Sequence, residues 1–105
     1  MWFLETSFFT RQISSLLSGE EYRQLQRTII LRPEQGSLIP GSNGLRKIRC
    51  AQGGRGKRGG CRVIYYWDVK SEGFFMLLAY PKTEKDDLTR SELKDLRSLV
   101  KEEFK

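Results

Sequence analysis

The spacing of apolar and polar residues predicts a strand and two helices in the first third of the chain. The first residues, MWFLET, are mostly aromatic or aliphatic and predict a short strand. From Ser7 to Leu17 apolar residues recur at helical spacing, which predicts a first helix. Ser18 and Glu21 form the S-x-x-E pattern of a capping box, so we expect a second helix to begin there and to end before Pro33.

Three apolar runs farther along the chain predict a sheet. A loop rich in proline and glycine, RPEQGSLIPGSNG, precedes the strand-like runs LRKIRCA, CRVIYYW and FFMLLAY. The last two runs are apolar on both faces, as central strands are, and the short turn DVKSEG joins them. A second capping box, Thr89 with Glu92, begins a C-terminal helix. The order β-α-α-β-β-β-α predicts a small α+β domain with an antiparallel sheet, two N-terminal helices and a C-terminal helix.

The length and the charge fit one globular domain with a local cationic segment. The chain of 105 residues is long enough for a single domain, 1–105, with its own core. The net charge is +6, yet residues 44–66 hold seven cations and no acidic residue, so the rest of the chain is nearly neutral. These cations are Arg46, Lys47, Arg49, Arg55, Lys57, Arg58 and Arg62. A basic segment in an otherwise neutral domain indicates a docking surface for a polyanion.

In the strand-like run LRKIRCA, alternation places some of these cations on the same face. Lys47 and Arg49 fall on one face of the run, and Arg46 falls on the other face with Ile48. Arg62 begins the partner strand across the hairpin. If Lys47, Arg49 and Arg62 share a sheet face, the cations converge and phosphate is their natural counterion. The alternative interpretation is a charged sheet face that only meets solvent.

The connection between these two strands is a glycine-rich basic loop, 52–60. Its sequence GGRGKRGG makes it flexible and lets a ligand approach the backbone closely. It resembles an RGG-type RNA-binding arm, with Arg55, Lys57 and Arg58 as phosphate contacts. The residues GKR lack the Ser or Thr that holds magnesium in a phosphate-binding loop, so we exclude nucleoside triphosphate binding. The alternative is a mobile hairpin tip made soluble by its charges.

The two cysteines, Cys50 and Cys61, flank this loop. The chain has no histidine, so the cysteines cannot complete the usual zinc ligand set. We expect them to be two small buried thiols in a reducing cytoplasm, although a cross-strand pair is geometrically conceivable. The N-terminal residues lack a basic leader and a long apolar segment, so we expect neither a signal peptide nor a membrane span.

The basic strands also suit the cleavage of RNA. RNA carries its own nucleophile, the 2′-hydroxyl, so a protein needs only to orient it, take its proton and stabilise the phosphorane. Histidine is absent, but a lysine among other cations can act as the base, because like charges favour its neutral form. Lys47 is the best candidate by position. Arg49 cannot be a base because guanidinium stays protonated in proteins, and the planar fork of Arg62 suits the phosphorane.

The run LRKIRCAQGGRGKRGGCRVIYY, followed by LLAYPKTEKDDL and a terminal helix, resembles the HigB-type branch of the RelE/ParE toxin superfamily. The upstream run GEEYRQLQRTIILRPEQGSLIPGSNG fits the same branch, so the resemblance covers nearly the whole chain. It implies a bacterial or phage-encoded toxin that enters the ribosomal A site and cuts mRNA there without metal or cofactor. It also implies a compact antiparallel sheet with two N-terminal helices and a C-terminal helix. The implied partners are the ribosome, mRNA and a HigA-type helix-turn-helix antitoxin in the cytoplasm.

The resemblance also implies roles for single residues. Lys47 matches a lysine that contacts RNA, and Arg62 matches the arginine that holds the scissile phosphate. The YPKTEK segment matches a basic stretch that supplies the acid or the transition-state charge. Its candidates here are Lys82 and Lys85, with Tyr80 as a stacking or hydroxyl partner. Together with the basic loop, Arg46 and Arg49 complete the expected contacts to RNA and the ribosome.

Two departures from the family pattern leave the general base open. Arg49 stands where the best-known member has a second lysine, and only Thr89 lies near the place of a late tyrosine that stacks on a base. The candidates for the base are Lys47, Lys57, Lys82 and Glu84.

For the remaining site residues, purely structural roles are alternative interpretations. Tyr65, Tyr66 and Tyr80 suit strand packing as well as ligand contact. Lys82 and Lys85 suit loop charges paired with Asp86 and Asp87 as well as catalytic groups.

Two other functions compete with the mRNA-cleaving toxin. One is a ParE-like inhibitor of DNA gyrase, which has the same fold and acts by binding a protein. The other is a non-catalytic RNA-binding module with a flexible arm. The dense basic sheet face favours the first function, because a gyrase inhibitor has no need to hold RNA phosphate.

Overall fold

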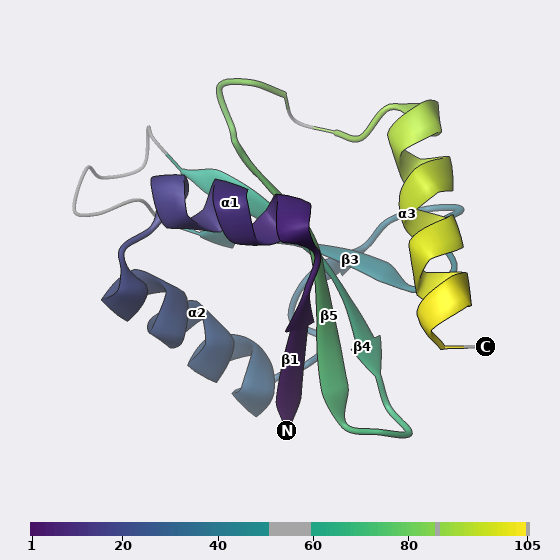
Figure 1. The fold of residues 1–105 in the computed structure, drawn as a ribbon, viewed down its shortest axis with the longest axis horizontal. Helices are drawn as coiled ribbons and strands as arrows, with labels where there is room; N and C mark the ends of the chain where they lie inside the picture. The colour runs from purple at the N-terminus through teal and green to yellow at the C-terminus, as the bar shows by residue number, and fades with distance from the viewer. Residues whose placement is uncertain (51–59, 86, 105) are drawn as a thin grey trace.

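The computed structural model describes residues 1–50, 60–85 and 87–104 and has the predicted α+β architecture (Figure 1). The elements in chain order are β1 (Trp2–Glu5), α1 (Ser7–Leu16), α2 (Gly19–Leu31), β2 (Ser37–Leu38), β3 (Leu45–Cys50), β4 (Cys61–Asp68), β5 (Gly73–Pro81) and α3 (Arg90–Glu103). Within the described residues, the one addition to the predicted order is β2, a two-residue strand in the proline- and glycine-rich loop. None of the helices in the described part of the chain is long and apolar enough to cross a membrane.

The sheet has the strand order β1-β5-β4-β3-β2. The pairs β3–β4 and β4–β5 are antiparallel, as predicted, and the added strand β2 is antiparallel to β3, but β1 pairs with β5 in parallel. The expectation of a fully antiparallel sheet is therefore wrong at this edge. Hairpins make neighbouring strands antiparallel, and no hairpin joins β1 to β5, because the chain leaves β1 for α1 and α2. Thr6 fixes the parallel edge, since its backbone N–H donates to the carbonyl of Met76 at 3.1 Å.

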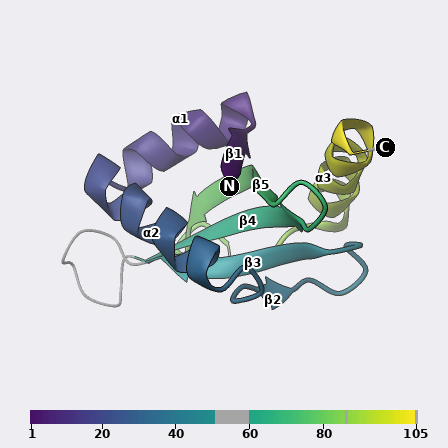
Figure 2. The same cartoon turned by 90° about the horizontal axis from the view of Figure 1, so that it is seen from below.

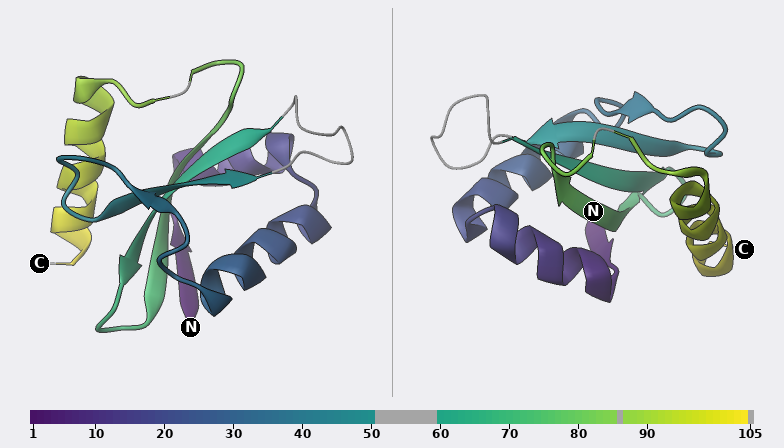
Figure 3. Two further views of the ribbon diagram at one scale, coloured as in Figure 1. Left: turned by 180° about the vertical axis from the view of Figure 1, so that it is seen from behind. Right: turned by 90° about the horizontal axis from the view of Figure 1, so that it is seen from above.

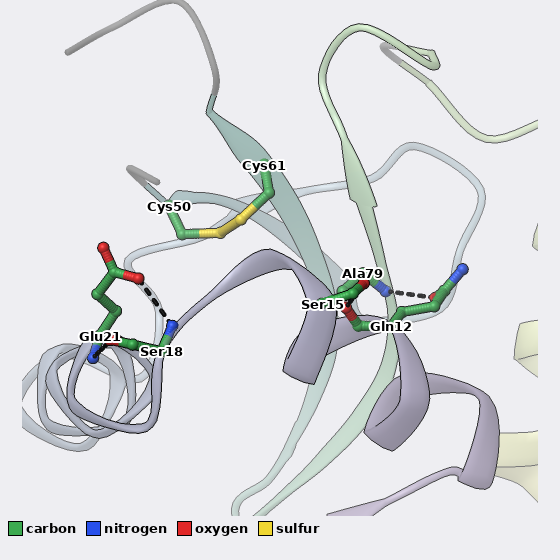
Figure 4. Close-up of a disulfide and its surroundings, with 7 residues drawn as sticks. All are labelled: Gln12, Ser15, Ser18, Glu21, Cys50, Cys61 and Ala79. Atoms are coloured by element: carbon green, nitrogen blue, oxygen red, sulfur yellow. Dashed lines mark hydrogen bonds between the residues drawn. A yellow bond between two sulfur atoms is a disulfide. The ribbon is translucent and has the colours of Figure 1, made fainter. Parts of the chain in front are cut away.

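Both predicted capping boxes are present. In α2, the N–H of Glu21 donates to Ser18 Oγ at 3.1 Å, and the N–H of Ser18 donates to Glu21 Oε1 at 2.8 Å (Figure 4). In α3, Thr89 and Glu92 make the same reciprocal contacts at 3.1 and 2.9 Å. These bonds satisfy N–H groups that the first turn of a helix leaves without partners.

Alternation along the strands gives the sheet two apolar faces. Helices α1 and α2 cover one face and α3 covers part of the other, so the helices lie on opposite flanks of β4 and β5 (Figures 1 and 2). The first core contains Phe9, Ile13, Leu25, Ile29, Ile48, Val63, Tyr65, Phe74 and Met76. The second core contains Leu45, Ile64, Phe75, Leu77, Leu78, Tyr80 and Leu96, with Val100 and Phe104 packed against it.

A bulge in β5 shifts this alternation. Ile64 pairs with Leu78, but the next residue of β4, Tyr65, pairs with Met76, so Leu77 is an extra residue. Leu77 and Leu78 both join the core under α3. The shift therefore puts Tyr80, rather than Ala79, on the α3 face of the sheet.

Cys50 and Cys61 form a disulfide bond, so the expectation of free thiols is wrong (Figure 4). The two residues are direct partners across β3 and β4, with their Cα atoms 5.2 Å apart, within the usual range for a bridge. Both are buried in the first core, as predicted. The bond closes the foot of the hairpin whose loop lies outside the described residues.

Candidate nucleic-acid interface

A row of side chains crosses three strands on the α3 face of the sheet. Arg49 of β3 lies opposite Arg62 of β4, and Arg62 lies opposite Tyr80 of β5. Direct partners in a sheet share a face, and the adjoining pair Cys50–Cys61 points to the other face. Lys47 precedes Arg49 by two residues and therefore shares its face, opposite Ile64. The structure thus brings Lys47, Arg49 and Arg62 onto one face of the sheet.

The members of this row differ in their access to solvent. Arg49 is exposed, Lys47 is half-buried, and Arg62 is buried with 7% of its surface exposed. Tyr80 is only 1% exposed and belongs to the core under α3. Arg62 therefore forms the floor of the row and Arg49 its rim.

Asp87, in the connection between β5 and α3, supplies an acid to the row. Its Oδ1 lies 2.6 Å from Lys47 Nζ, and the carboxylate is exposed to solvent. The hydrogen bond from Lys47 and the charge of Lys47 hold the pKa of Asp87 below its usual range, and the charge of Arg62 adds to this effect. Like charges that face each other across strands are destabilising, so a carboxylate here stabilises the cationic row.

Lys85, in the same connection, sits above Tyr80. Its Nζ lies 5.1 Å from the centroid of the Tyr80 ring, within cation–π range. Lys85 also pairs with Glu92 of α3, and this hydrogen bond holds the pKa of Glu92 below its usual range. We call Lys47, Arg49, Arg62 and Lys85 the basic cluster. The alternative interpretation paired Lys85 with Asp86 or Asp87, but among the described residues its acidic partner is Glu92.

The other residues of the YPKTEK segment lie beside the cluster. Lys82 is exposed directly after β5, and its backbone N–H donates to the carbonyl of Gly60 at 2.9 Å. This bond places Lys82 at the foot of the basic hairpin. Glu84 is exposed in the turn that follows. The Tyr80 ring is packed in the core, so its role as a stacking partner for a base would require Lys85 to move.

Arg46 is separated from the basic cluster by the sheet. Its guanidinium donates to the carbonyls of Glu34 and Gly36 at 2.9 and 2.8 Å. The hydroxyl of Tyr65 holds the same segment, because it accepts from the N–H of Gly36 at 3.0 Å and donates to the carbonyl of Pro33 at 2.7 Å. Burial raises the pKa of this tyrosine. The structure therefore does not bring Arg46 together with the other predicted RNA contacts.

The remaining predicted contacts, Arg55, Lys57 and Arg58, lie outside the described residues, as does the basic loop 52–60 except Gly60.

The two acidic members of the site were not predicted in these roles. Glu92 was predicted only as a capping residue. Its Oε1 accepts the capping hydrogen bond from the N–H of Thr89, and its Oε2 contacts Lys85. A capping glutamate has a second carboxylate oxygen, and this was the one feature of the sequence that could have indicated a further partner for Glu92. The pairing of Asp87 with Lys47 joins residues 40 positions apart and has no local signature in the sequence.

The side chains of the basic cluster are of the kinds that bind a phosphodiester. A guanidinium can bind two phosphate oxygens at once, and ammonium groups around it add positive charge. In the comparison with known protein families, residues 23–105 match the model described as the RelE toxin of the RelE/RelB toxin–antitoxin system. The match includes β3, β4, β5 and α3 and therefore every residue of the basic cluster.

Proposed function

Because the chain belongs to the RelE toxin family of toxin–antitoxin systems, we propose that it is a ribosome-dependent endoribonuclease. In this proposal it enters the ribosomal A site and cuts the mRNA there, which stops translation. The observation that carries the proposal is the placement of Lys47, Arg49 and Arg62 on one face of β3 and β4. Such a face offers several positive charges to one sugar–phosphate link.

The proposed chemistry uses the 2′-hydroxyl of the RNA as the nucleophile. Its oxygen attacks the adjacent phosphorus while the bond from phosphorus to the 5′-oxygen breaks, which leaves a 2′,3′-cyclic phosphate and a 5′-hydroxyl. Arg62 holds two nonbridging oxygens and stabilises the charge that grows on them. Arg49 and Lys47 hold the flanking phosphates and keep the link in line for attack.

Two proton transfers complete the reaction. A base takes the proton of the 2′-hydroxyl, and an acid gives a proton to the departing 5′-oxygen. Lys82 and Lys85 are the candidates for the acid, since both follow β5 beside the row. Lys47 is a candidate base only in its neutral form and away from Asp87, because an ammonium has no electron pair with which to accept a proton. Glu84 and Lys82 stay candidates for the base because both side chains are exposed at the edge of the cluster.

Within the family we place the chain in the HigB-type branch, on the motifs around the basic hairpin. Its antitoxin is then a HigA-type helix-turn-helix protein, and its site of action is the cytoplasm, where ribosomes are. The neighbouring reading frame tests this assignment directly, because it should encode a small protein of that kind.

The test of the proposed function is mRNA cleavage on programmed ribosomes. Purified toxin is added to ribosomes that carry a defined mRNA, cuts are mapped by primer extension, and ribosome binding is measured by co-sedimentation. We expect cuts only at the codon in the A site. Arg62→Ala should lower cleavage at least about a hundredfold, the size of effect seen when one donor to a transition-state oxyanion is removed, with a much smaller loss of ribosome binding. Arg62→Lys should recover part of the activity, because it keeps the charge and loses the fork.

Matched controls make this test specific. Arg27→Ala removes an exposed arginine from α2, on the other face of the molecule, and should leave cleavage unchanged. Circular dichroism checks that the buried Arg62 variants fold. Equal losses of cleavage and binding in Arg62→Ala would contradict a role in the chemistry. Inhibition of DNA supercoiling by gyrase without mRNA cuts would favour the ParE-like function, and ribosome binding without cuts would favour a binding module.

A further inference from the structure

A hollow of about 530 Å³ lies between α3 and the loop that joins β2 to β3. This loop runs beside α3 (Figure 3). Tyr66, Val100 and Phe104 supply apolar surface to the hollow, and Ser42, Asn43 and Ser98 supply hydroxyl and amide groups. The hollow is separate from the basic cluster, because none of the four residues of the cluster lines it. Its volume is in the range of sites for single small ligands.

The α3 side of the hollow is strongly basic. Lys94, Arg97 and Lys101 line it and are exposed, and none of the described residues that line it is acidic. Their spacing of three and four residues puts them on one stripe of the helix. Arg90 extends the stripe by one turn toward the start of α3, where Glu92 contacts the basic cluster. From Glu92 to Lys101 the helix rises about 13 Å, so the two sites lie along one helix.

The opposite wall is built by a tightly held turn. Ser42 is only 2% exposed, and its hydroxyl donates to the carbonyl of Ile39 at 2.5 Å and accepts from the N–H of Leu45 at 3.0 Å. Asn43, which lines the hollow beside Ser42, has a left-handed backbone with φ of 63°. Asparagine tolerates this conformation better than most residues. The wall is therefore formed before any ligand arrives.

The floor is aromatic and also fixed. The rings of Tyr66 and Phe104 lie 5.3 Å apart, and Phe104 packs in turn on Phe75 and Trp2. Gly44 lies against the Tyr66 ring, since a Cβ at this position would come within 3.3 Å of the ring. Aromatic surface, hydrogen-bonding side chains and a cationic rim are the three features that proteins use to hold a nucleotide of single-stranded RNA.

We propose that this hollow binds a nucleotide of single-stranded RNA outside the cleavage site. The base packs against the aromatic surface of Tyr66 and Phe104, and Asn43 and Ser98 meet its polar edge. Lys94, Arg97 and Lys101 hold the phosphates on either side. The inference rests on the proposed function, because it takes RNA as the ligand, and it adds a second contact that orients the strand relative to the basic cluster.

An acidic segment of a protein partner fits the hollow less well. A helix that docks in a groove needs a continuous apolar channel for anchors spaced along several turns. Here the apolar surface is confined to the floor, and the wall is made of small polar side chains. A nucleotide uses both the aromatic floor, by stacking of its base, and the cationic rim, by contact with its phosphates. An acidic peptide would use only the cationic rim.

The experiment measures binding of an RNA that the protein cannot cut. The probe is a fluorescein-labelled hexamer of 2′-O-methyl RNA, and its affinity is measured by anisotropy over a range of salt. Lys94→Ala with Arg97→Ala should weaken binding roughly tenfold at low salt and make the slope of log affinity against log salt shallower by about 1.4, if each cation meets one phosphate of a single strand. The matched control, Arg27→Ala with Lys70→Ala, removes the same charge from exposed positions outside both sites.

A second measurement locates the bound base. A hexamer with one 4-thiouridine is cross-linked by light, and we expect the cross-linked peptide to contain Tyr66 or Phe104. The inference is overturned if the Lys94/Arg97 variant binds like its control, or if cross-links form only elsewhere. It is also overturned if this variant keeps its RNA affinity and loses affinity for the antitoxin instead.

The same experiment separates this inference from the proposed function. Arg49→Ala, which lies in the basic cluster, is measured beside the α3 variants. If Arg49→Ala weakens binding and the α3 variant does not, the proposed function stands and the second site falls. If the wild-type protein does not bind the hexamer, the second site falls, whereas the proposed function is refuted only by the absence of mRNA cuts on programmed ribosomes.

Discussion

The Nζ of Lys47 and Oδ1 of Asp87 lie 2.6 Å apart, although 40 residues separate them in the sequence. The carboxylate thus occupies a position on Lys47 that a phosphate oxygen would take. Asp87 is exposed, and exposed ion pairs contribute little to stability, so an incoming phosphodiester can displace it. Asp87 therefore acts as an internal competitor for the basic cluster.

We expect Asp87→Asn to tighten RNA binding. The asparagine keeps the size of the side chain and loses the negative charge, so it competes less with phosphate for Lys47. Affinity for the uncleavable hexamer should rise about three- to tenfold, a small change, as expected for the loss of an exposed ion pair. Glu72→Gln, in the exposed turn after β4, makes the same charge change away from the cluster and should leave the affinity nearly unchanged.

The pKa of Asp87 fixes how this effect depends on pH. Lys47 depresses the pKa, so Asp87 stays ionised at neutral pH and takes up a proton only below its ordinary value near 3.8. The ratio of the RNA affinity of Asp87→Asn to that of the wild type should therefore be constant around neutral pH. A ratio that changed there would show that a group other than Asp87 competes for the cluster.

A second prediction concerns the ion pair of Lys85 with Glu92. Because the folded-state pKa of Glu92 is depressed, the pair stabilises the fold fully above the ordinary glutamate value near 4.5 and is lost as the pH falls through the depressed value. Glu92→Gln keeps an acceptor for the cap of α3 and removes the charge. It should lower the free energy of unfolding by at most about 1 kcal/mol at neutral pH.

Urea unfolding at several pH values measures this difference. The gap between wild type and Glu92→Gln should stay constant from neutral pH down to about pH 5 and then close in more acidic buffer. Lys85→Met should remove the same pH-dependent part of the free energy of unfolding. A gap that persisted in acid would mean that the loss comes from the cap rather than from the ion pair.

A third prediction concerns the disulfide between Cys50 and Cys61. Its closed loop spans a sequence separation of 11, for which chain entropy predicts a stabilisation of about 2–3 kcal/mol. Reduction with a dithiol should lower the free energy of unfolding by this amount, as measured by urea denaturation. A variant with both cysteines changed to alanine should be insensitive to the dithiol. Identical unfolding curves for the oxidised and reduced wild type would contradict a stabilising role.

Much of the fold could be predicted because its signals are local. The capping boxes at Ser18 and Thr89 begin helices where predicted, and alternation along β3 separates Lys47 and Arg49 from Arg46. These features depend on residues within a few positions of each other. The shared face of Arg49 and Arg62 was a condition of the hypothesis and not a prediction, because it depends on the register of the hairpin.

The features that could not be predicted depend on register and on distant contacts. The disulfide requires Cys50 and Cys61 to be direct partners, and a slip of one residue would send their side chains to opposite faces. The bulge at Leu77 decides which face Tyr80 takes, and a run of apolar residues carries no sign of it. The parallel edge of β1 and the pairing of Asp87 with Lys47 join segments far apart in the chain.

The separation of Arg46 from Arg49 gives the last prediction. Arg46 donates two hydrogen bonds to the carbonyls of Glu34 and Gly36, so Arg46→Ala should lower the free energy of unfolding by about 1–2 kcal/mol. Arg49 is exposed on the opposite face, and Arg49→Ala should change stability by less than about 0.5 kcal/mol.

The effects of these two substitutions on RNA binding should have the reverse order, with the larger effect for Arg49→Ala. Arg49→Ala removes one phosphate contact, so the slope of log affinity against log salt should become shallower by about 0.7, while Arg46→Ala should leave the slope unchanged. Urea denaturation and anisotropy on the same two proteins measure both effects. A shallower slope in Arg46→Ala would mean that its guanidinium leaves the loop carbonyls to meet RNA, and the assignment of binding to the α3 face alone would then be wrong.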